Sequence, residues 1–182
     1  MNGRIEARIL FTGPPNAGKT TAIGTLSDVV PIVTDVDGRA LSSGESSAPG
    51  FDYGVVRIDG SEHVHLYGTR GRKRCDSTWR TLARNAIGVV ILIDNSHARA
   101  MSHLDEFLVG LKGVLGEVAC VVGVGRTQAH PLPSLDAFAT RLAFHGYMFP
   151  VVEVDVRSRD DVLLLVALLL AQADARLLLV QP

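Results

Sequence analysis

The residues with the clearest chemical meaning form one eight-residue run, Gly13-Pro-Pro-Asn-Ala-Gly-Lys-Thr20. The run matches the pattern G-x-x-x-x-G-K-[S/T], in which glycines let successive backbone N–H groups converge on phosphate oxygens. Lys19 is expected to reach the β- and γ-phosphates, and the hydroxyl of Thr20 is expected to bind Mg²⁺. The pattern therefore predicts a site for a nucleoside di- or triphosphate. The candidate phosphate contacts are Gly13, Asn16, Ala17, Gly18, Lys19, Thr20 and Thr21.

The segments on either side of this run predict the strand–loop–helix context that a phosphate-binding loop requires. Every second residue from Ile5 to Phe11 is apolar, so residues 4–12 are predicted to form a strand. Residues 19–27 then predict a short helix, whose first N–H groups and dipole favour a bound anion. The alternative interpretation is a glycine-rich turn with an incidental lysine.

The rest of the chain predicts strands alternating with helices. Further strands are predicted at 51–58, 62–68, 88–94, 117–124 and 149–156, and further helices at 75–86, 98–114, 134–145 and 158–178. Asp59-Gly60 is a hairpin signal between the first two of these strands, whereas residues 31–50 predict a long functional loop. The pattern predicts one α/β domain over residues 1–182, with helices on both faces of a six-stranded, mostly parallel sheet that contains one antiparallel hairpin strand.

Composition narrows the class of protein further. The net charge of −1 gives no general attraction to nucleic acid or to an anionic membrane. The longest apolar runs, Ala86–Ile93 and Val162–Ala171, are well short of the roughly 18 residues of a membrane span. With Cys75 and Cys120 as the only cysteines and no signal-peptide core, we expect a soluble, cytoplasmic protein.

Five sequence segments carry a resemblance to a known family. They are GPPNAGKTT, SDVVPIVTD, FDYG, HLYGTRG and GVVILIDNS, within residues 5 to about 172. In this order they resemble the small Ras-like GTPases of bacteria, in the branch often paired with roadblock-domain partners. The resemblance implies a Ras-like G domain of the P-loop class that binds GTP or GDP with Mg²⁺. It further implies a molecular switch that hydrolyses GTP slowly or only with a roadblock-type partner.

The second motif of this family is altered in the chain. The branch commonly has Gly-Thr-Pro-Gly-Gln here, so Gly68 is a family trait, while Arg70 and Arg72 are departures. Gly71 keeps the backbone N–H that would contact the γ-phosphate, and it is assigned a catalytic role together with Arg72. An arginine has donors only and cannot accept a hydrogen bond from the attacking water. Arg72 is either an arginine finger supplied in cis or part of a solvated basic loop.

The glycine at position 68, although common in this branch, replaces the aspartate of the Asp-x-x-Gly-Gln pattern and so removes a carboxylate near the metal. Because Mg²⁺ is held through one or two carboxylates, a replacement is expected, and Asp52 is the first candidate. It lies on the strand predicted to pair with 62–68, although an aspartate facing solvent at a strand edge is an equal alternative. Asp94 is the second candidate, but ordering the turn that follows it is the preferred interpretation. A threonine of the first switch is expected near Ser47, which still offers a hydroxyl.

The segments expected to bind the base also depart from the family. Gly125-Arg-Thr-Gln128 replaces Asn-Lys-x-Asp, and Gln128 offers one acceptor oxygen where an aspartate would accept two hydrogen bonds from guanine. The stem of Arg126 is expected to pack on the purine. Backbone N–H groups at Val156 and Arg157 are expected to face the guanine oxygen. Weak base discrimination follows, unless 125–128 is only a connecting loop.

Three functions remain open at this point. A nucleotide-dependent switch with weak GTPase activity is the leading hypothesis, and a pseudo-GTPase scaffold that binds nucleotide without hydrolysis is the alternative. A small-molecule kinase is disfavoured because the chain has no clear Arg-rich lid. Val162–Ala171 predicts a helix that is apolar on all sides, so one stripe should cover the sheet and the other should meet a neighbouring helix or a partner chain.

Overall fold

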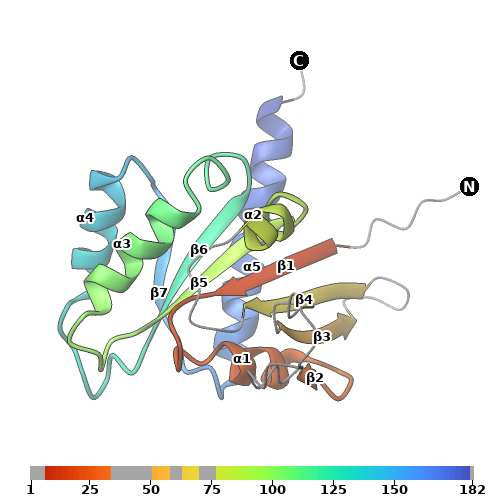
Figure 1. Cartoon of the computed structure of the whole chain (residues 1–182), viewed down its shortest axis with the longest axis horizontal. Coiled ribbons are helices and arrows are strands. Elements are labelled where there is room, and N and C mark those ends of the chain that lie inside the picture. The colour runs from red at the N-terminus through yellow and green to blue at the C-terminus, as the bar shows by residue number, and fades with distance from the viewer. Residues whose placement is uncertain (1–6, 34–50, 58–62, 70–76, 181–182) are drawn as a thin grey trace, which may run out of the picture.

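The structure is a computed structural model that describes residues 7–33, 51–57, 63–69 and 77–180. These residues contain one seven-stranded sheet with the strand order β2-β3-β4-β1-β5-β6-β7 (Figure 1). The strands are β1 (Ala7–Thr12), β2 (Ile32–Val33), β3 (Phe51–Arg57), β4 (His63–Thr69), β5 (Gly88–Asp94), β6 (Ala119–Gly125) and β7 (Val151–Glu153).

The sheet is mostly parallel, as the alternation of strands and helices predicted. β1 lies between β4 and β5 and pairs with both in parallel, and β6 is parallel to both β5 and β7. β3 is antiparallel to β2 and to β4, so β3 and β4 form the predicted hairpin. The residues that connect them, 58–62, lie outside the described part of the chain.

The two-residue strand β2 is an addition to the six predicted strands. Ile32 and Val33 fall at the start of the segment that was predicted to be a loop, and they pair with Tyr53 and Asp52 at the edge of the sheet. A strand this short cannot show the alternation by which strands are recognised in a sequence. Its formation depends on the free edge of β3, which no local pattern predicts.

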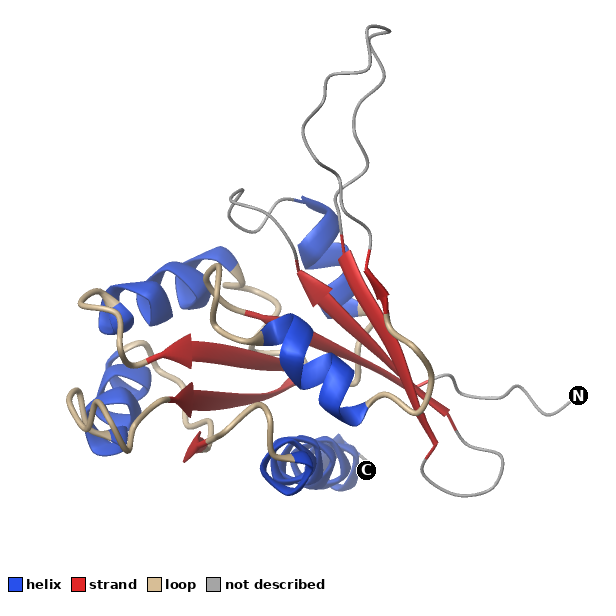
Figure 2. Ribbon diagram, turned by 90° about the horizontal axis from the view of Figure 1, so that it is seen from below, coloured by secondary structure: helices blue, strands red, loops and turns tan. Residues whose placement is uncertain are grey.

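Helices cover both faces of the sheet (Figure 2). They are α1 (Lys19–Leu26), α2 (Ser77–Arg84), α3 (Ala100–Gly110), α4 (Leu135–Phe144) and α5 (Arg159–Val180). One cluster of buried apolar side chains lies between the sheet and α1 with α5, and a second lies between the sheet and α2, α3 and α4. The predicted three-layer α/β arrangement is therefore confirmed.

β5 is buried on both sides because it lies between these two clusters. Residues 88–93 are all buried, as the continuous apolar run predicted. Gly88 is required at the start of β5, since a Cβ atom there would come within 2.6 Å of the Cγ atom of Leu169 in α5. Because β1, β5, β6 and β7 are parallel, the loops that follow them gather at one edge of the sheet, where ligands bind in open α/β sheets.

The long helix α5 is only partly covered. Val162, Leu165 and Leu169 are fully buried, which confirms that one stripe of the helix packs on the sheet. Leu163 and Leu164 are 39% and 50% exposed, so a partner chain over this part of the helix stays a prediction. Within the residues that the structure describes, no helix is both long and apolar enough to cross a membrane.

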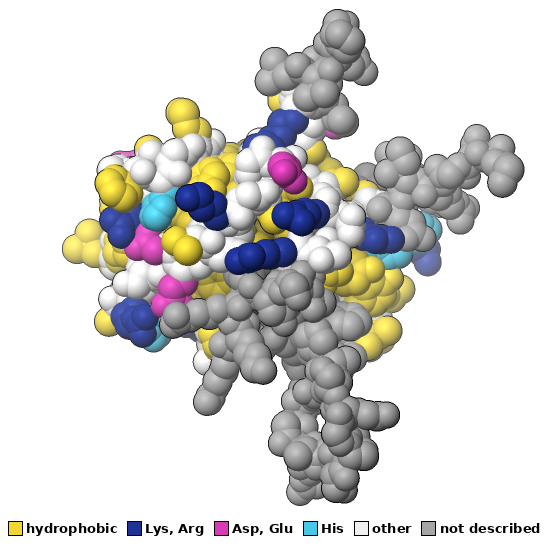
Figure 3. Space-filling model, turned by 45° about the horizontal axis from the view of Figure 1, so that its top comes forward, with side chains coloured by type: hydrophobic (Ala, Val, Ile, Leu, Met, Phe, Trp, Pro, Cys, Tyr) yellow, Lys and Arg dark blue, Asp and Glu magenta, His cyan; other side chains and the backbone are white. Residues whose placement is uncertain are grey.

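Charged side chains of both signs are interspersed with apolar ones on the face seen in Figure 3. Arg99, directly before α3, forms an ion pair with Glu106 of α3, and Arg141 of α4 forms one with Asp105 of α3. This mixture agrees with the net charge of −1, which produces no strong field of one sign.

Candidate functional site

The phosphate-loop residues form a tight turn between β1 and α1. Three of them have positive φ angles, namely Gly13 at 144°, Asn16 at 64° and Gly18 at 91°. A Cβ atom on Gly13 would lie 2.2 Å from the carbonyl oxygen of Leu92, so a side chain at this position would collide with the backbone of β5. The glycines of the motif are therefore needed by the local backbone itself, whether or not a ligand is bound.

The single lysine of the loop is held inside it. Lys19 is 9% exposed, and its Nζ atom donates to the carbonyl oxygens of Gly13 and Pro14 at 2.9 and 2.8 Å. These contacts place the ammonium group within the turn, beside the first N–H groups of α1. A cation and a helix N-terminus together make a local environment that favours phosphate.

Asp52 meets Thr20 beneath the loop. The hydroxyl of Thr20 donates to the Oδ2 atom of Asp52 at 2.5 Å, and Asp52 is completely buried. Asp52 lies directly opposite Gly68 in the β3–β4 hairpin. A Cβ atom on Gly68 would be 3.2 Å from the Cβ atom of Asp52 and 2.7 Å from the Cδ1 atom of Ile23. The site thus has room for one carboxylate, and Asp52 supplies it from the neighbouring strand.

This pair of oxygen ligands fits a hard divalent cation such as Mg²⁺. Mg²⁺ keeps several waters and binds through one or two carboxylates and substrate phosphates. A hydroxyl has two lone pairs besides its proton, so Thr20 can bind a cation and still donate to Asp52. Among the described residues, no group of three His, Cys, Asp or Glu side chains is placed to hold a metal.

Two threonines at the ends of neighbouring strands were missed by the sequence reasoning. The hydroxyls of Thr12, at the end of β1, and Thr69, at the end of β4, lie 3.3 Å apart and are buried. Thr69 also lines the pocket described next. A polar residue at the end of an apolar strand is a signal that could have identified both.

A pocket of about 1020 Å³ joins the phosphate loop to the segments predicted to bind the base. It is lined by residues 15–21, by Thr69 and Asp94, by residues 125–130 and 153–157, and by Asp161. The structure thus brings together three segments that are more than a hundred residues apart at their extremes. The volume is at the upper end of the range for small-molecule sites, which is about 300–1,000 Å³.

Arg126 is positioned by the end of β5. It has a φ angle of 62°, and its Nη1 atom donates to the Oδ2 atom of Asp94 and, at 3.2 Å, to the hydroxyl of Ser96. The backbone N–H and the hydroxyl of Ser96 both donate to the Oδ1 atom of Asp94, at 2.9 and 2.6 Å. Burial alone would raise the pKa of Asp94, but hydrogen bonds from Ser96 and Arg126 hold this pKa below its ordinary value.

These contacts confirm one expectation and add to another. Asp94 does order the turn after β5, as preferred, and its ion pair with Arg126 was not anticipated. Arg126 was expected to act through its stem, yet its guanidinium is fixed by a carboxylate. Gln128 is exposed and lines the pocket, as its assignment to the base requires.

The loop after β7 contains a second arginine–aspartate pair. The Nε and Nη2 atoms of Arg157 donate to the two carboxylate oxygens of Asp155 at 2.9 and 2.7 Å. This hydrogen bonding, chiefly from the Arg157 side chain, lowers the pKa of Asp155 to about 2. Val156 lies between them and packs close to Gly18, where an added Cβ atom would be 2.8 Å from its Cγ2 atom.

A buried asparagine anchors the loop after β6. Asn95 is 3% exposed, and its Nδ2 atom donates to the carbonyl oxygens of His130 and Pro133 at 2.6 and 3.0 Å. Its backbone N–H donates to the carbonyl oxygen of Gly125 at 3.1 Å. The wall of the pocket formed by 125–130 is therefore tied to β5 at both ends.

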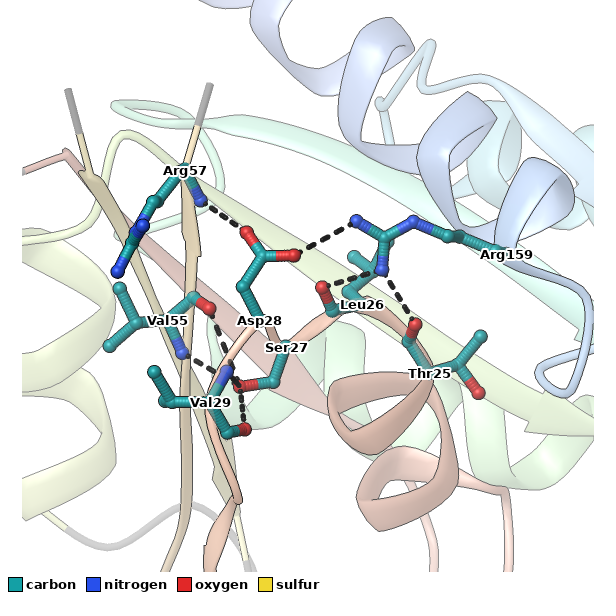
Figure 4. Close-up of polar contacts among 8 residues, drawn as sticks. All are labelled: Thr25, Leu26, Ser27, Asp28, Val29, Val55, Arg57 and Arg159. Carbon is teal, nitrogen blue, oxygen red and sulfur yellow. Dashed lines mark hydrogen bonds and ion pairs between the residues drawn. The ribbon is translucent and has the colours of Figure 1, made fainter. Parts of the chain in front are cut away.

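A polar network connects the start of α5 to the end of α1 (Figure 4). The Nη1 atom of Arg159 donates to the carbonyl oxygens of Thr25 and Leu26 at 3.0 and 2.9 Å, and its Nη2 atom donates to Asp28 at 3.3 Å. The hydroxyl of Thr25 donates to the carbonyl oxygen of Val156 at 2.8 Å. The helix that carries Lys19 and the loop that carries Val156 are thus connected directly.

The remaining predicted positions lie outside the described residues. They are Gly71, Arg72 and the altered second motif around Arg70, and the first-switch position near Ser47. Their roles stay predictions.

Comparison with known proteins adds no family. No protein-family model matches the chain, and no curated protein matches it. The geometry of the pocket is therefore the basis on which a function can be assigned.

Proposed function

We propose that this protein binds GTP or GDP with Mg²⁺ and acts as a Ras-like molecular switch. The observation that carries the proposal is the pocket of about 1020 Å³, whose lining combines the lysine-containing loop with residues 125–130 and 153–157. A nucleoside triphosphate needs both parts of such a lining, one for its anionic oxygens and one for its base. Lys19 and the start of α1 favour the phosphates, and the two loops offer polar groups to the base.

Thr20 and Asp52 are the residues that would hold the metal. A bound Mg²⁺ would neutralise charge on the phosphates. Asp52 supports this role by accepting a hydrogen bond from the Thr20 hydroxyl, which fixes the orientation of that hydroxyl and leaves its lone pairs for the cation. The same buried carboxylate compensates for the glycine at position 68.

Hydrolysis is proposed to be slow or to depend on a partner. Arg72 replaces a residue that would orient the attacking water, and an arginine cannot accept a hydrogen bond from it. An unassisted Ras-like domain hydrolyses GTP at roughly 10⁻⁴ s⁻¹, and we expect this chain to be no faster. The same substitution supports a second candidate, a nucleotide-binding scaffold without hydrolysis. A roadblock-type protein partner rests on the family resemblance, and a cytoplasmic location rests on the low cysteine content.

Titration of a fluorescent GDP analogue tests the proposal, with the wild type compared with Lys19→Ala. Binding should be lost in Lys19→Ala, because the variant lacks the cation that is held inside the loop at 2.8–2.9 Å from two carbonyls. Lys112→Ala is the matched control, since Lys112 is exposed and remote from the pocket lining. Thermal melting of each variant separates loss of binding from loss of fold. Equal affinity in the wild type and in Lys19→Ala would refute the phosphate site.

A further inference from the structure

The guanidinium group of Arg126 is held in place through its Nη1 atom. Its Nη1 atom is occupied by Asp94 and Ser96, whereas no described residue accepts a hydrogen bond from its Nε or Nη2 atoms. The side chain is 57% exposed and lines the pocket. The Nε and Nη2 groups are parallel N–H donors, which is the arrangement that contacts two adjacent acceptors at once.

Three of the carboxylates in the pocket lining already accept hydrogen bonds from other groups of the protein. Asp94 accepts from Ser96 and Arg126, and both oxygens of Asp155 accept from Arg157. Both carboxylate oxygens of Asp161 are likewise occupied, by the Ser158 hydroxyl and the backbone N–H of residue 155. Asp94, Asp155 and Asp161 therefore already accept hydrogen bonds from protein donors, whereas the Nε–Nη2 edge of Arg126 has no acceptor among the described residues.

Such a surface favours bases that present acceptors. Guanine and hypoxanthine both carry the O6 and N7 acceptors, and paired contacts from arginine to these two atoms are the commonest specific contact to guanine in protein–DNA complexes. Adenine places an N6 amino donor at the same edge, where it would face the N–H donors of Arg126. The pocket should therefore favour 6-oxopurines over adenine.

The 2-amino group of guanine has no comparable partner. Recognition of the N1–H together with the 2-amino group requires two acceptor oxygens, and Gln128 offers one. The N1–H, which guanine and hypoxanthine share, can use that oxygen. Glu153 is the remaining carboxylate in the lining of the pocket. If it accepted a hydrogen bond from the 2-amino group, the site would bind guanine more tightly than hypoxanthine.

We propose that this site selects 6-oxopurine nucleotides through the Nε–Nη2 edge of Arg126 and does not distinguish GTP from ITP. The inference rests on the proposed nucleotide site and adds a base specificity to it. This specificity differs from that of sites in which a carboxylate recognises guanine. Asp94 is a positioning residue in this scheme, because it holds Arg126 by the opposite edge.

Competition experiments with GTP, ITP and ATP against a fluorescent GDP analogue test this inference. In the wild type, GTP and ITP should compete within about twofold of each other, and ATP should be weaker by about tenfold or more, as expected for one paired base contact. In Arg126→Gln the GTP/ATP ratio should fall toward one, because a glutamine amide can turn to donate or accept. Arg84→Gln is the control, since Arg84 is exposed and absent from the pocket lining.

Each result bears on the inference in a definite way. Binding of GTP about tenfold tighter than ITP would overturn it and would direct attention to Glu153 as the acceptor. Equal competition by ATP and GTP in the wild type, or an unchanged GTP/ATP ratio in Arg126→Gln, would overturn it while leaving the phosphate site intact. If no nucleotide of any base binds, both this inference and the proposed function are wrong.

Discussion

Replacing Asp52 by asparagine should reduce the dependence of nucleotide binding on Mg²⁺. The Oδ2 atom of Asp52 lies 2.5 Å from the hydroxyl oxygen of Thr20. A cation bound to that hydroxyl at about 2.1 Å would therefore lie within about 4.6 Å of the carboxylate oxygen. Asparagine keeps the shape of the side chain and an acceptor for the hydroxyl, so the change removes the charge while preserving the contact.

The size of the effect follows from this geometry. At about 4.6 Å and an effective dielectric constant of about 20, a carboxylate attracts a divalent ion by about 7 kcal/mol. Phosphate charges and desolvation offset most of this attraction. If about 1.4 kcal/mol remains, the Mg²⁺-linked gain in nucleotide affinity should fall by about tenfold in Asp52→Asn.

The measurement is the affinity for a fluorescent GDP analogue with excess Mg²⁺ and with excess chelator. The ratio of the two affinities should fall in Asp52→Asn and stay at the wild-type value in Asp174→Asn, an exposed carboxylate on α5 outside the pocket lining. A Mg²⁺ effect of the same size in the wild type and in Asp52→Asn would show that Asp52 has no role toward the cation.

Two further predictions concern residues in which the chain departs from the family that its motifs resemble. Gln128→Asp should raise the preference for GTP over ATP by about 1–3 kcal/mol, the usual cost of an unpaired buried polar group, and competition binding should then also separate GTP from ITP. An unchanged preference would mean that residues 125–128 do not contact the base. Arg72→Gln should raise the single-turnover rate of GTP hydrolysis, because an amide can orient the attacking water. A fast wild-type enzyme that slows in Arg72→Gln would instead identify Arg72 as an arginine finger and exclude the scaffold.

The elements with strong local patterns could be predicted from the sequence. The strand at 88–94 was predicted with the bounds that the structure has. A continuous apolar run with a turn at each end is typical of a strand buried on both faces, and this pattern is visible in the local sequence. The phosphate loop was equally visible, since its glycines are demanded by positive φ angles within the loop. The β3–β4 hairpin was predicted because two alternating segments flank a turn signal.

Other features depend on partners that are distant in the sequence. Asp52 and Asp94 were both predicted as candidates for the metal, and only the hairpin register shows that Asp52 lies opposite Gly68 and beside Thr20, 32 residues away in the chain. Strand β2 and the ion pair between Asp94 and Arg126 were not anticipated at all. Alternation and residue spacing describe how a segment is buried, but they carry no information about which side chain lies across from it. Strand order and register decide those contacts, so the conformation of the phosphate loop was determined locally, whereas the carboxylate beneath it and the hydrogen bonds that hold Arg126 were decided by the tertiary structure.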